Sequence, residues 1–184
     1  NKIKSWKTDV SHGGGALSYF FSHVLYYLEY FVGKIKNVES QLFSSKKSLN
    51  QGETEVLMNV LFENGCIGNI HMNIASIDKQ THSIKFLFDN GSMSLANNST
   101  DAIDGFELND ISQNKIKKIE IANNLKLYQN EVEDSRVKVI TLIAEKFIQW
   151  CNTGTPSKPD FQDGLRVQEL IEMVRKSASK DLVK

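Results

Sequence analysis

Hydrophobic and polar positions along the chain fall into three successive patterns. The first covers residues 16–32, where nearly every position is apolar or aromatic and Glu29 is the only charged residue. A helix this apolar is buried rather than laid on a surface. Three glycines at residues 13–15 precede it, and Gly33 is well placed to end it. The pattern therefore predicts a buried helix over residues 16–32, covered on both of its apolar faces.

The second pattern alternates with period two and predicts β-strands between about residues 34 and 122. Two Asn-Gly dipeptides, at residues 64–65 and 90–91, separate alternating segments, and this dipeptide is a strong hairpin signal. Several antiparallel strands with one wetter face predict an open sheet. The expected strands are residues 38–43, 53–63, 66–76, 83–89, 92–97, 105–109 and 115–122.

The third pattern is helical. Apolar residues at helical spacing predict helices over residues 135–152 and 162–179, with Gly154 and Pro156 between them. Of the remaining segments, residues 3–10 are expected to be extended, residues 123–133 to form a polar connection, and residues 182–183 to form a short last strand. The fold class that follows is α+β, an open, largely antiparallel β-sheet with helices packed on one face.

Length and charge limit the classes of function. A chain of 184 residues forms one domain, or one with a small appendage, and can bury a core. Lys and Arg number 22, as do Asp and Glu, so the net charge is zero and nucleic acid is not an expected partner. No segment has the apolar length that crosses a bilayer, and no signal peptide is recognised. Because the chain starts at Asn1 without a methionine, we expect a piece of a longer protein.

The two cysteines, Cys66 and Cys151, lie far apart without metal-like partners. Such sparse use is typical of free thiols in a reducing compartment, so we expect a cytoplasmic protein. No two histidines or cysteines have the spacing of metal ligands, and no metal site is expected.

The glycine run and the histidine that follows it indicate one wall of a site. Glycine lets another group approach the main chain closely. His23 lies in the second turn of the apolar helix, where its surroundings can move an imidazole pKa across neutrality. No Gly-x-Gly-x-x-Gly is present, so residues 13–15 are interpreted as close packing near a cofactor held by another domain. A tight turn into a packed helix and a phosphate cradle at the helix start are the alternatives.

The order of the motifs resembles that of one known family. Trp6, Lys7 and Asp9 are followed by Gly-Gly-Gly-x-Leu at residues 13–17 and by His23. The later motifs are an Asn-Gly hairpin with Gly65 and Gly68, Gly-Ser-x-x-Leu at residues 91–95, and Asp-Gly-Leu-Arg at residues 163–166. From Trp6 to about Ala178 the chain resembles the C-terminal domain of the Gfo/Idh/MocA family of NAD(P)-dependent sugar and cyclitol oxidoreductases.

This resemblance implies that residues 1–184 form a substrate-binding and dimerisation domain. It also implies an N-terminal Rossmann domain, absent from this chain, that holds NAD or NADP. The open sheet would join two subunits, and the isolated domain would be inactive. A sugar, nucleotide sugar or cyclitol would be the substrate.

The family's histidine, at the position of His23, would take or deliver the proton that accompanies hydride transfer, often with a lysine from the first domain. The expected substrate contacts are Lys7, Tyr19 and Asp163, and the expected cofactor contacts are Gly14 and Gly15.

Two positions depart from the family pattern. Many members carry Asp four residues before the histidine and again three residues after it, where this chain has Tyr19 and Tyr26. A tyrosine can hydrogen-bond but is not ionised near neutral pH. Either His23 suffices with the lysine of the other domain, or the substrate and chemistry differ. The structural alternatives are a core role for His23, a first-turn acid at Asp163 and an ion-pair partner at Arg166.

Three hypotheses about function follow. The first is the substrate-binding part of an oxidoreductase with His23 as acid or base. The second is a non-catalytic binding or assembly module of the same fold, which Tyr19 and Tyr26 favour. The third is a sheet-based protein–protein module without a ligand.

Overall fold

The computed structural model describes residues 6–44, 52–76, 81–101, 103, 105–112, 115–121 and 134–178. The chain divides into two compact units, the first of Asn1–Ser76 with Lys158–Lys184 and the second of Ile77–Ser157. Helices and antiparallel strands occur in both, so the α+β class is confirmed. The expected segments at residues 123–133 and 182–183 lie outside the described residues.

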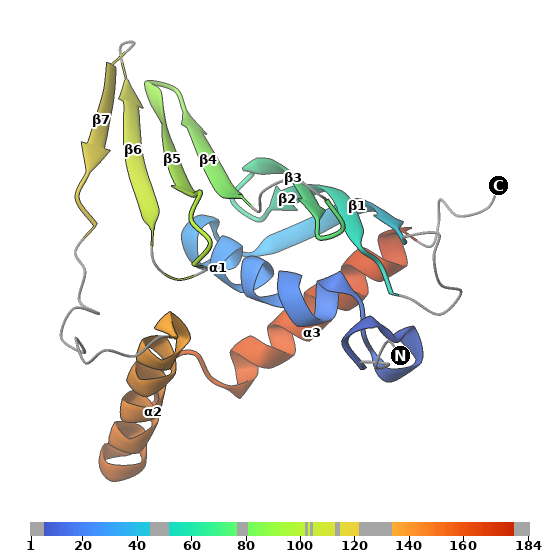
Figure 1. Ribbon diagram of the computed structural model, residues 1–184, viewed down its shortest axis with the longest axis vertical. Helices are drawn as coiled ribbons and strands as arrows, with labels where there is room; N and C mark the ends of the chain where they lie inside the picture. Colours follow the sequence, from blue (N-terminus) through green and yellow to red (C-terminus); the bar gives the residue numbers. More distant parts are fainter. Residues whose placement is uncertain are drawn as a thin grey trace. The chain divides into compact units, whose positions relative to one another are not determined.

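The first unit is a three-stranded sheet with helices on one face (Figure 1). Its strands, β1 (Ile35–Phe43), β2 (Glu55–Phe62) and β3 (Ile67–Asn73), are antiparallel in the order β1-β2-β3. Helix α3 (Phe161–Ala178) packs along β1, and α1 (Ser22–Val32) packs against α3. The buried core between them contains Ala16, Leu17, Phe21, Leu25, Ile35, Val38, Val56, Met58, Val60, Phe62, Met72, Val167, Leu170, Ile171 and Val174.

The predicted hairpin between β2 and β3 is present. Gly65 has φ +88°, a left-handed conformation that favours glycine. The Asn64 side chain accepts a hydrogen bond from Cys66 N at 3.0 Å and donates one to Val32 O at 2.7 Å. The turn therefore also ties the hairpin to the end of α1.

The second unit has a sheet of its own. Strands β4 (His82–Phe88), β5 (Gly91–Asn97), β6 (Phe106–Ser112) and β7 (Lys115–Ile119) pair antiparallel in that order. Helix α2 (Ser135–Thr153) follows them in sequence. The described strands therefore divide between two sheets, whereas their alternation alone does not specify which strands pair.

Asp134 caps the start of α2, and its carboxylate accepts hydrogen bonds from Arg136 N at 3.0 Å and Arg136 Nε at 2.8 Å. These bonds lower the pKa of Asp134 to about 2 from an ordinary 3.8. Because the pKa is lowered by folding, the stabilisation is complete above about pH 4 and is lost as the pH falls toward 2. A carboxyl NMR titration should find this value in the native protein. Arg136→Gln should raise it, and an Asp134 pKa at or above the ordinary value would contradict the cap.

The start of the described chain differs from the sequence prediction. An extended segment was expected over residues 3–10. Asp9 is extended, but the expectation is wrong for residues 6–8 and 10, because Trp6–Thr8 and Val10–His12 form 3₁₀ turns. The side chain of Asp9 accepts bonds from Ser11 N at 2.9 Å and Ser11 Oγ at 2.6 Å, which lower the Asp9 pKa. Local capping by a short acidic side chain competes with extended structure, which explains the difference.

Within the described part of the chain, no helix is both long enough and apolar enough to cross a membrane.

Candidate active site

The glycine run is packed tightly by the chain itself. A Cβ at Gly14 would overlap the carbonyl oxygen of Trp6, and a Cβ at Gly15 would overlap the carboxylate of Glu53. Gly15 also has φ +116°, which L side chains rarely adopt. Both glycines are buried, so they have a packing role; a cofactor contact at Gly14 and Gly15 stays a prediction.

The helix that follows is capped from a distant part of the chain. Ala16, at the cap position, makes no side-chain bond, and the first amides of a helix lack partners within the helix. Instead, Ala16 N donates to Glu53 O at 2.8 Å, and Leu17 N donates to Glu53 Oε1 at 3.1 Å. The Glu53 side chain is only 9% exposed. This carboxylate therefore acts as the missing N-cap.

Arg175 from α3 completes the same cluster. Its Nη2 donates to Gly14 O at 3.2 Å and to Ser18 Oγ at 3.0 Å. The same atom lies 3.4 Å from Glu53 Oε1. The sequence alone does not reveal Glu53 or Arg175, because their roles depend on contacts between residues far apart in the chain.

The expected helix over residues 16–32 is not uniform. Leu17–Phe21 form a π-helical turn, and the α-helix begins at Ser22. Single π turns inside helices occur frequently at functional sites. His23 is the second residue after this turn, and it is exposed.

Two of the predicted substrate contacts lie together beside this turn. Lys7 Nζ lies 5.9 Å from the centroid of the Tyr19 ring, within cation–π range. Tyr19 is half-buried in the π turn, and His23 follows it by four residues. Lys7 and Tyr19 are therefore brought together next to the segment that carries the histidine.

Among the described residues of the first unit, one face of the helix is covered and the other is partly exposed. Leu17, Phe21 and Leu25 are buried, whereas Phe20 is 48% exposed and Tyr30 is 76% exposed. The sequence predicted that both faces are covered. In the described structure His23 instead belongs to a partly exposed aromatic face, which leaves the imidazole accessible.

Asp163 is a first-turn acid of α3, as one alternative predicted. Its carboxylate accepts a bond from Asp160 N at 2.8 Å, and Asp160 Oδ1 accepts one from Asp163 N at 3.2 Å. This reciprocal pair is a capping box. Lys158 Nζ also bonds Asp163 Oδ1 at 3.0 Å. A substrate contact at Asp163 stays a prediction.

Tyr26 of α1 lies near enough to this helix start for the charge of Asp163 to affect its pKa. Burial raises the pKa of the Tyr26 hydroxyl, and the charge of Asp163 raises it further. The phenol is therefore neutral near pH 7, where an Asp at this position would be a carboxylate.

Arg166 is the ion-pair partner that the sequence predicted, and its partner is Glu29. Arg166 Nη2 lies 2.8 Å from Glu29 Oε1, and Nε lies 3.1 Å from Glu29 Oε2. The pair also binds the backbone of Ile35, whose carbonyl accepts from Arg166 Nη2 at 2.9 Å and whose amide donates to Glu29 Oε1 at 2.8 Å. The single charge of the apolar helix thus fixes its C-terminal end.

Replacement of Arg166 by Met should lower the free energy of unfolding by about 1–3 kcal/mol, because it leaves the mostly buried Glu29 carboxylate without its partner. The loss is smaller than for a fully buried pair, because Arg166 is partly exposed. Lys118→Met removes an exposed pair with Glu107 and should cost less than about 1 kcal/mol. Urea unfolding of both variants measures the difference. Equal losses would contradict the structural importance of the Glu29–Arg166 pair.

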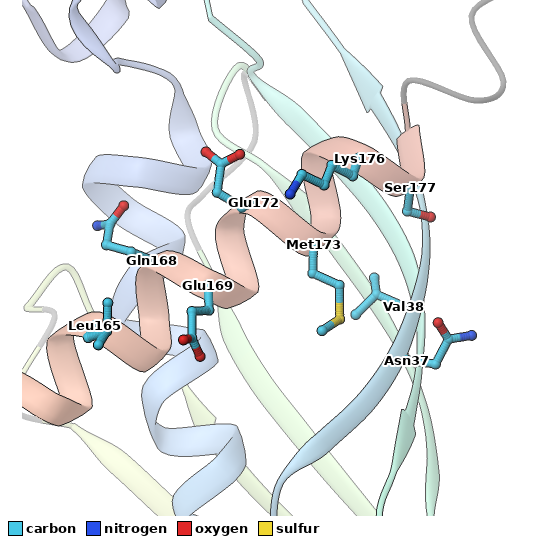
Figure 2. Close-up of a pocket in the computed structure, with 9 residues that line it drawn as sticks. All are labelled: Asn37, Val38, Leu165, Gln168, Glu169, Glu172, Met173, Lys176 and Ser177. Atoms are coloured by element: carbon cyan, nitrogen blue, oxygen red, sulfur yellow. The ribbon is translucent and has the colours of Figure 1, made fainter.

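A separate groove of about 650 Å³ lies between β1 and α3. Figure 2 shows Met173 of α3 pointing toward Val38 of β1, with Glu172 and Lys176 on the helix above them. None of the predicted site residues lines it. The groove and the predicted site residues are therefore separate features of the first unit.

Comparison with known proteins identifies the family. The profile described as "Oxidoreductase family, C-terminal alpha/beta domain", that of Gfo/Idh/MocA proteins, matches residues 1–183. The chain belongs to this family. Among curated proteins no sequence matches significantly.

Solved structures similar to this Gfo/Idh/MocA domain share its fold at low identity. A levoglucosan dehydrogenase in complex with NADH and levoglucosan is 21% identical with a TM-score of 0.74, over 98% of this chain and 53% of that one. The WlbA dehydrogenase of Bordetella pertussis, in complex with NADH and UDP-GlcNAcA, is 17% identical with a TM-score of 0.63, over 92% and 44%. An aldose-aldose oxidoreductase of Caulobacter crescentus, complexed with glycerol, is 16% identical with a TM-score of 0.73, over 96% and 49%. The chain thus spans about half the length of these solved chains.

Proposed function

We propose that this domain supplies the substrate-binding wall of an NAD(P)-dependent oxidoreductase that acts on a sugar, nucleotide sugar or cyclitol. A Rossmann domain elsewhere in the same protein holds NAD or NADP. The family supports this proposal, as do the complexes of its structural neighbours with NADH and sugar compounds.

The observation that carries the proposal is the exposed His23 at the junction of a π turn and an α-helix, on a partly exposed aromatic face. Such a face would form one wall of a site for a nicotinamide and a sugar. It would not enclose them, because Trp6 and Glu53 already occupy the space beside Gly14 and Gly15. Binding of the rest of the dinucleotide belongs to the other domain.

In the proposed reaction, His23 accepts the proton of a substrate hydroxyl while the carbon–hydrogen bond of that carbinol breaks. A nicotinamide bound by the other domain would supply the hydride acceptor or donor. In the reverse direction the protonated imidazole returns the proton to the carbonyl oxygen. Lys7 and Tyr19 hold a polar or anionic group of the substrate, and Asp163 is the third proposed contact.

A non-catalytic binding or assembly module is the second candidate. It is favoured by Tyr19 and by Tyr26, whose raised pKa keeps a neutral phenol where many family members have a carboxylate. With phenols at both positions where many family members have a carboxylate, this candidate binds substrate without turnover.

The outer face of β1–β3 is the proposed interface with a second copy of the chain. It carries a polar ladder, in which Asn69 Nδ2 donates to Asn59 at 2.6 Å and His71 Nε2 bonds Glu55 at 2.8 Å. Size-exclusion chromatography with light scattering tests this interface, and a monomer at high concentration would contradict it. We place the protein in the cytoplasm, which its exposed free cysteines favour.

The full-length protein should oxidise or reduce a sugar-like substrate with NAD(H) or NADP(H). The change in nicotinamide absorbance measures this turnover across a panel of sugars, nucleotide sugars and cyclitols. A substrate and cofactor that together raise the melting temperature without turnover would favour the non-catalytic module. If no compound of the panel is bound or turned over, both candidates are contradicted.

A further inference from the structure

The start of the helix that carries His23 is held by two charges from other elements. Glu53 Oε1 accepts a hydrogen bond from the Leu17 amide at 3.1 Å, and Arg175 Nη2 donates one to Gly14 O at 3.2 Å. The two charged groups approach each other to 3.4 Å. Their contacts all fall on residues 14–18, immediately before the segment with His23.

A hydrogen-bond acceptor is needed at this place, and a negative charge is favoured, for a physical reason. The first amides of a helix carry partial positive charge and have no partners within the helix. A buried carboxylate there makes charge-assisted hydrogen bonds, which are stronger than neutral ones. Gly15 and Gly52 lie so close that a Cβ on Gly52 would overlap Gly15, and this approach brings Glu53 beneath the turn.

The anchored segment leads directly to the imidazole. Leu17, the residue capped by Glu53, is the first residue of the π turn, and His23 follows at the second position of α1. The opposite end of α1 has its own anchor, the Glu29–Arg166 pair. The two ion pairs therefore fix different ends of one helix, and only one of them adjoins the histidine.

We propose that Glu53, paired with Arg175, is a positioning residue for His23. Its charge holds the glycine turn and the π turn in place, and through them it sets where the imidazole meets the substrate. This inference rests on the proposed function of His23. Neither Glu53 nor Arg175 touches substrate or cofactor in this proposal.

The test compares Glu53→Gln with Glu29→Gln in the full-length protein, well below both melting temperatures. Each variant removes one carboxylate charge from an ion pair that holds the segment carrying His23. Glu53→Gln should lower kcat about 10- to 100-fold, because a displacement of about 1 Å can cost this much. Its KM for the nicotinamide cofactor should change less than about 2-fold, since uniform binding is not altered. Glu29→Gln should lose stability but keep kcat within about 2-fold.

A second readout is independent of turnover. The ring-proton NMR signals of His23 should shift in Glu53→Gln and stay in place in Glu29→Gln. Should Glu53→Gln fail to fold, Arg175→Lys and Arg175→Met take its place. The lysine keeps the charge and should retain more kcat than the methionine.

The outcomes separate the two proposals. Normal kcat in Glu53→Gln, or equal kcat in the two Arg175 variants, together with a large loss in His23→Ala, would overturn the positioning role and leave the proposed function intact. Full activity in His23→Ala would overturn the proposed function itself. Equal losses of kcat in Glu53→Gln and Glu29→Gln would reduce Glu53 to a general stabilising residue.

Discussion

His23→Ala is expected to lower kcat of the full-length protein by about 10²- to 10⁴-fold, the usual contribution of a positioned general acid or base. The imidazole is exposed, so its removal leaves no buried cavity and should change the melting temperature little. Because the side chain acts in proton transfer, kcat should fall more than the affinity for cofactor. Steady-state kinetics and thermal unfolding on the same preparations measure both quantities.

The matched control is His12→Ala. His12 is also an exposed histidine of the first unit, but it lies in the 3₁₀ turn ahead of the glycine run, where its Nδ1 is 3.3 Å from Asp9 Oδ2. It should retain the activity of the natural protein. Equal activities of the two variants, in a protein with measurable turnover, would rule out the acid–base role of His23.

Gly15→Ala is expected to reduce the free energy of unfolding by about 3–5 kcal/mol, the range for disruption of a buried charge network. The new Cβ would overlap the Glu53 carboxylate, and Gly15 has φ +116°. The carboxylate would have to leave the helix start, so the Leu17 amide would lose its cap. Urea unfolding of the full-length protein measures the loss.

Gly13→Ala is the control for conformation alone. Gly13 also has a positive φ, +75°, but a Cβ there would meet nothing within 4 Å. The expected loss is about 1–2 kcal/mol, the cost of a left-handed conformation for alanine. If both alanine variants lose the same amount, the overlap with Glu53 contributes nothing.

The sequence predicts well those parts of the fold that depend on local patterns. The predicted helices over residues 135–152 and 162–179 differ by a residue from α2 and α3. The Asn64-Gly65 turn is also found, because its conformation is set by its own residues. Glu29 is the only charge of an apolar helix, which makes a buried partner such as Arg166 necessary.

The parts that the sequence could not predict depend on distant contacts. Nothing in residues 17–21 distinguishes a π turn from an α-helix by apolar spacing, and Glu53 is 36 residues from the amide that it caps. The division of the strands between two sheets likewise depends on pairing and not on alternation. At the site, the structure brings Lys7 to Tyr19, whereas the chemical roles of His23, Lys7, Tyr19, Gly14, Gly15 and Asp163 stay predictions.

The spacing of two arginines on α3 sets the position of the segment that carries His23. Arg166 and Arg175 lie nine residues apart on α3, about 13 Å along its axis; Arg166 binds Glu29 near the C-terminal end of α1, and Arg175 binds Gly14 and Ser18 ahead of its start. One inserted residue between them would rotate the second arginine by about 100° away from the glycine turn, and the two anchors could no longer be engaged together. The number of residues between Arg166 and Arg175 is therefore constrained more than their identity. An insertion there should displace the His23 imidazole without changing any residue around it.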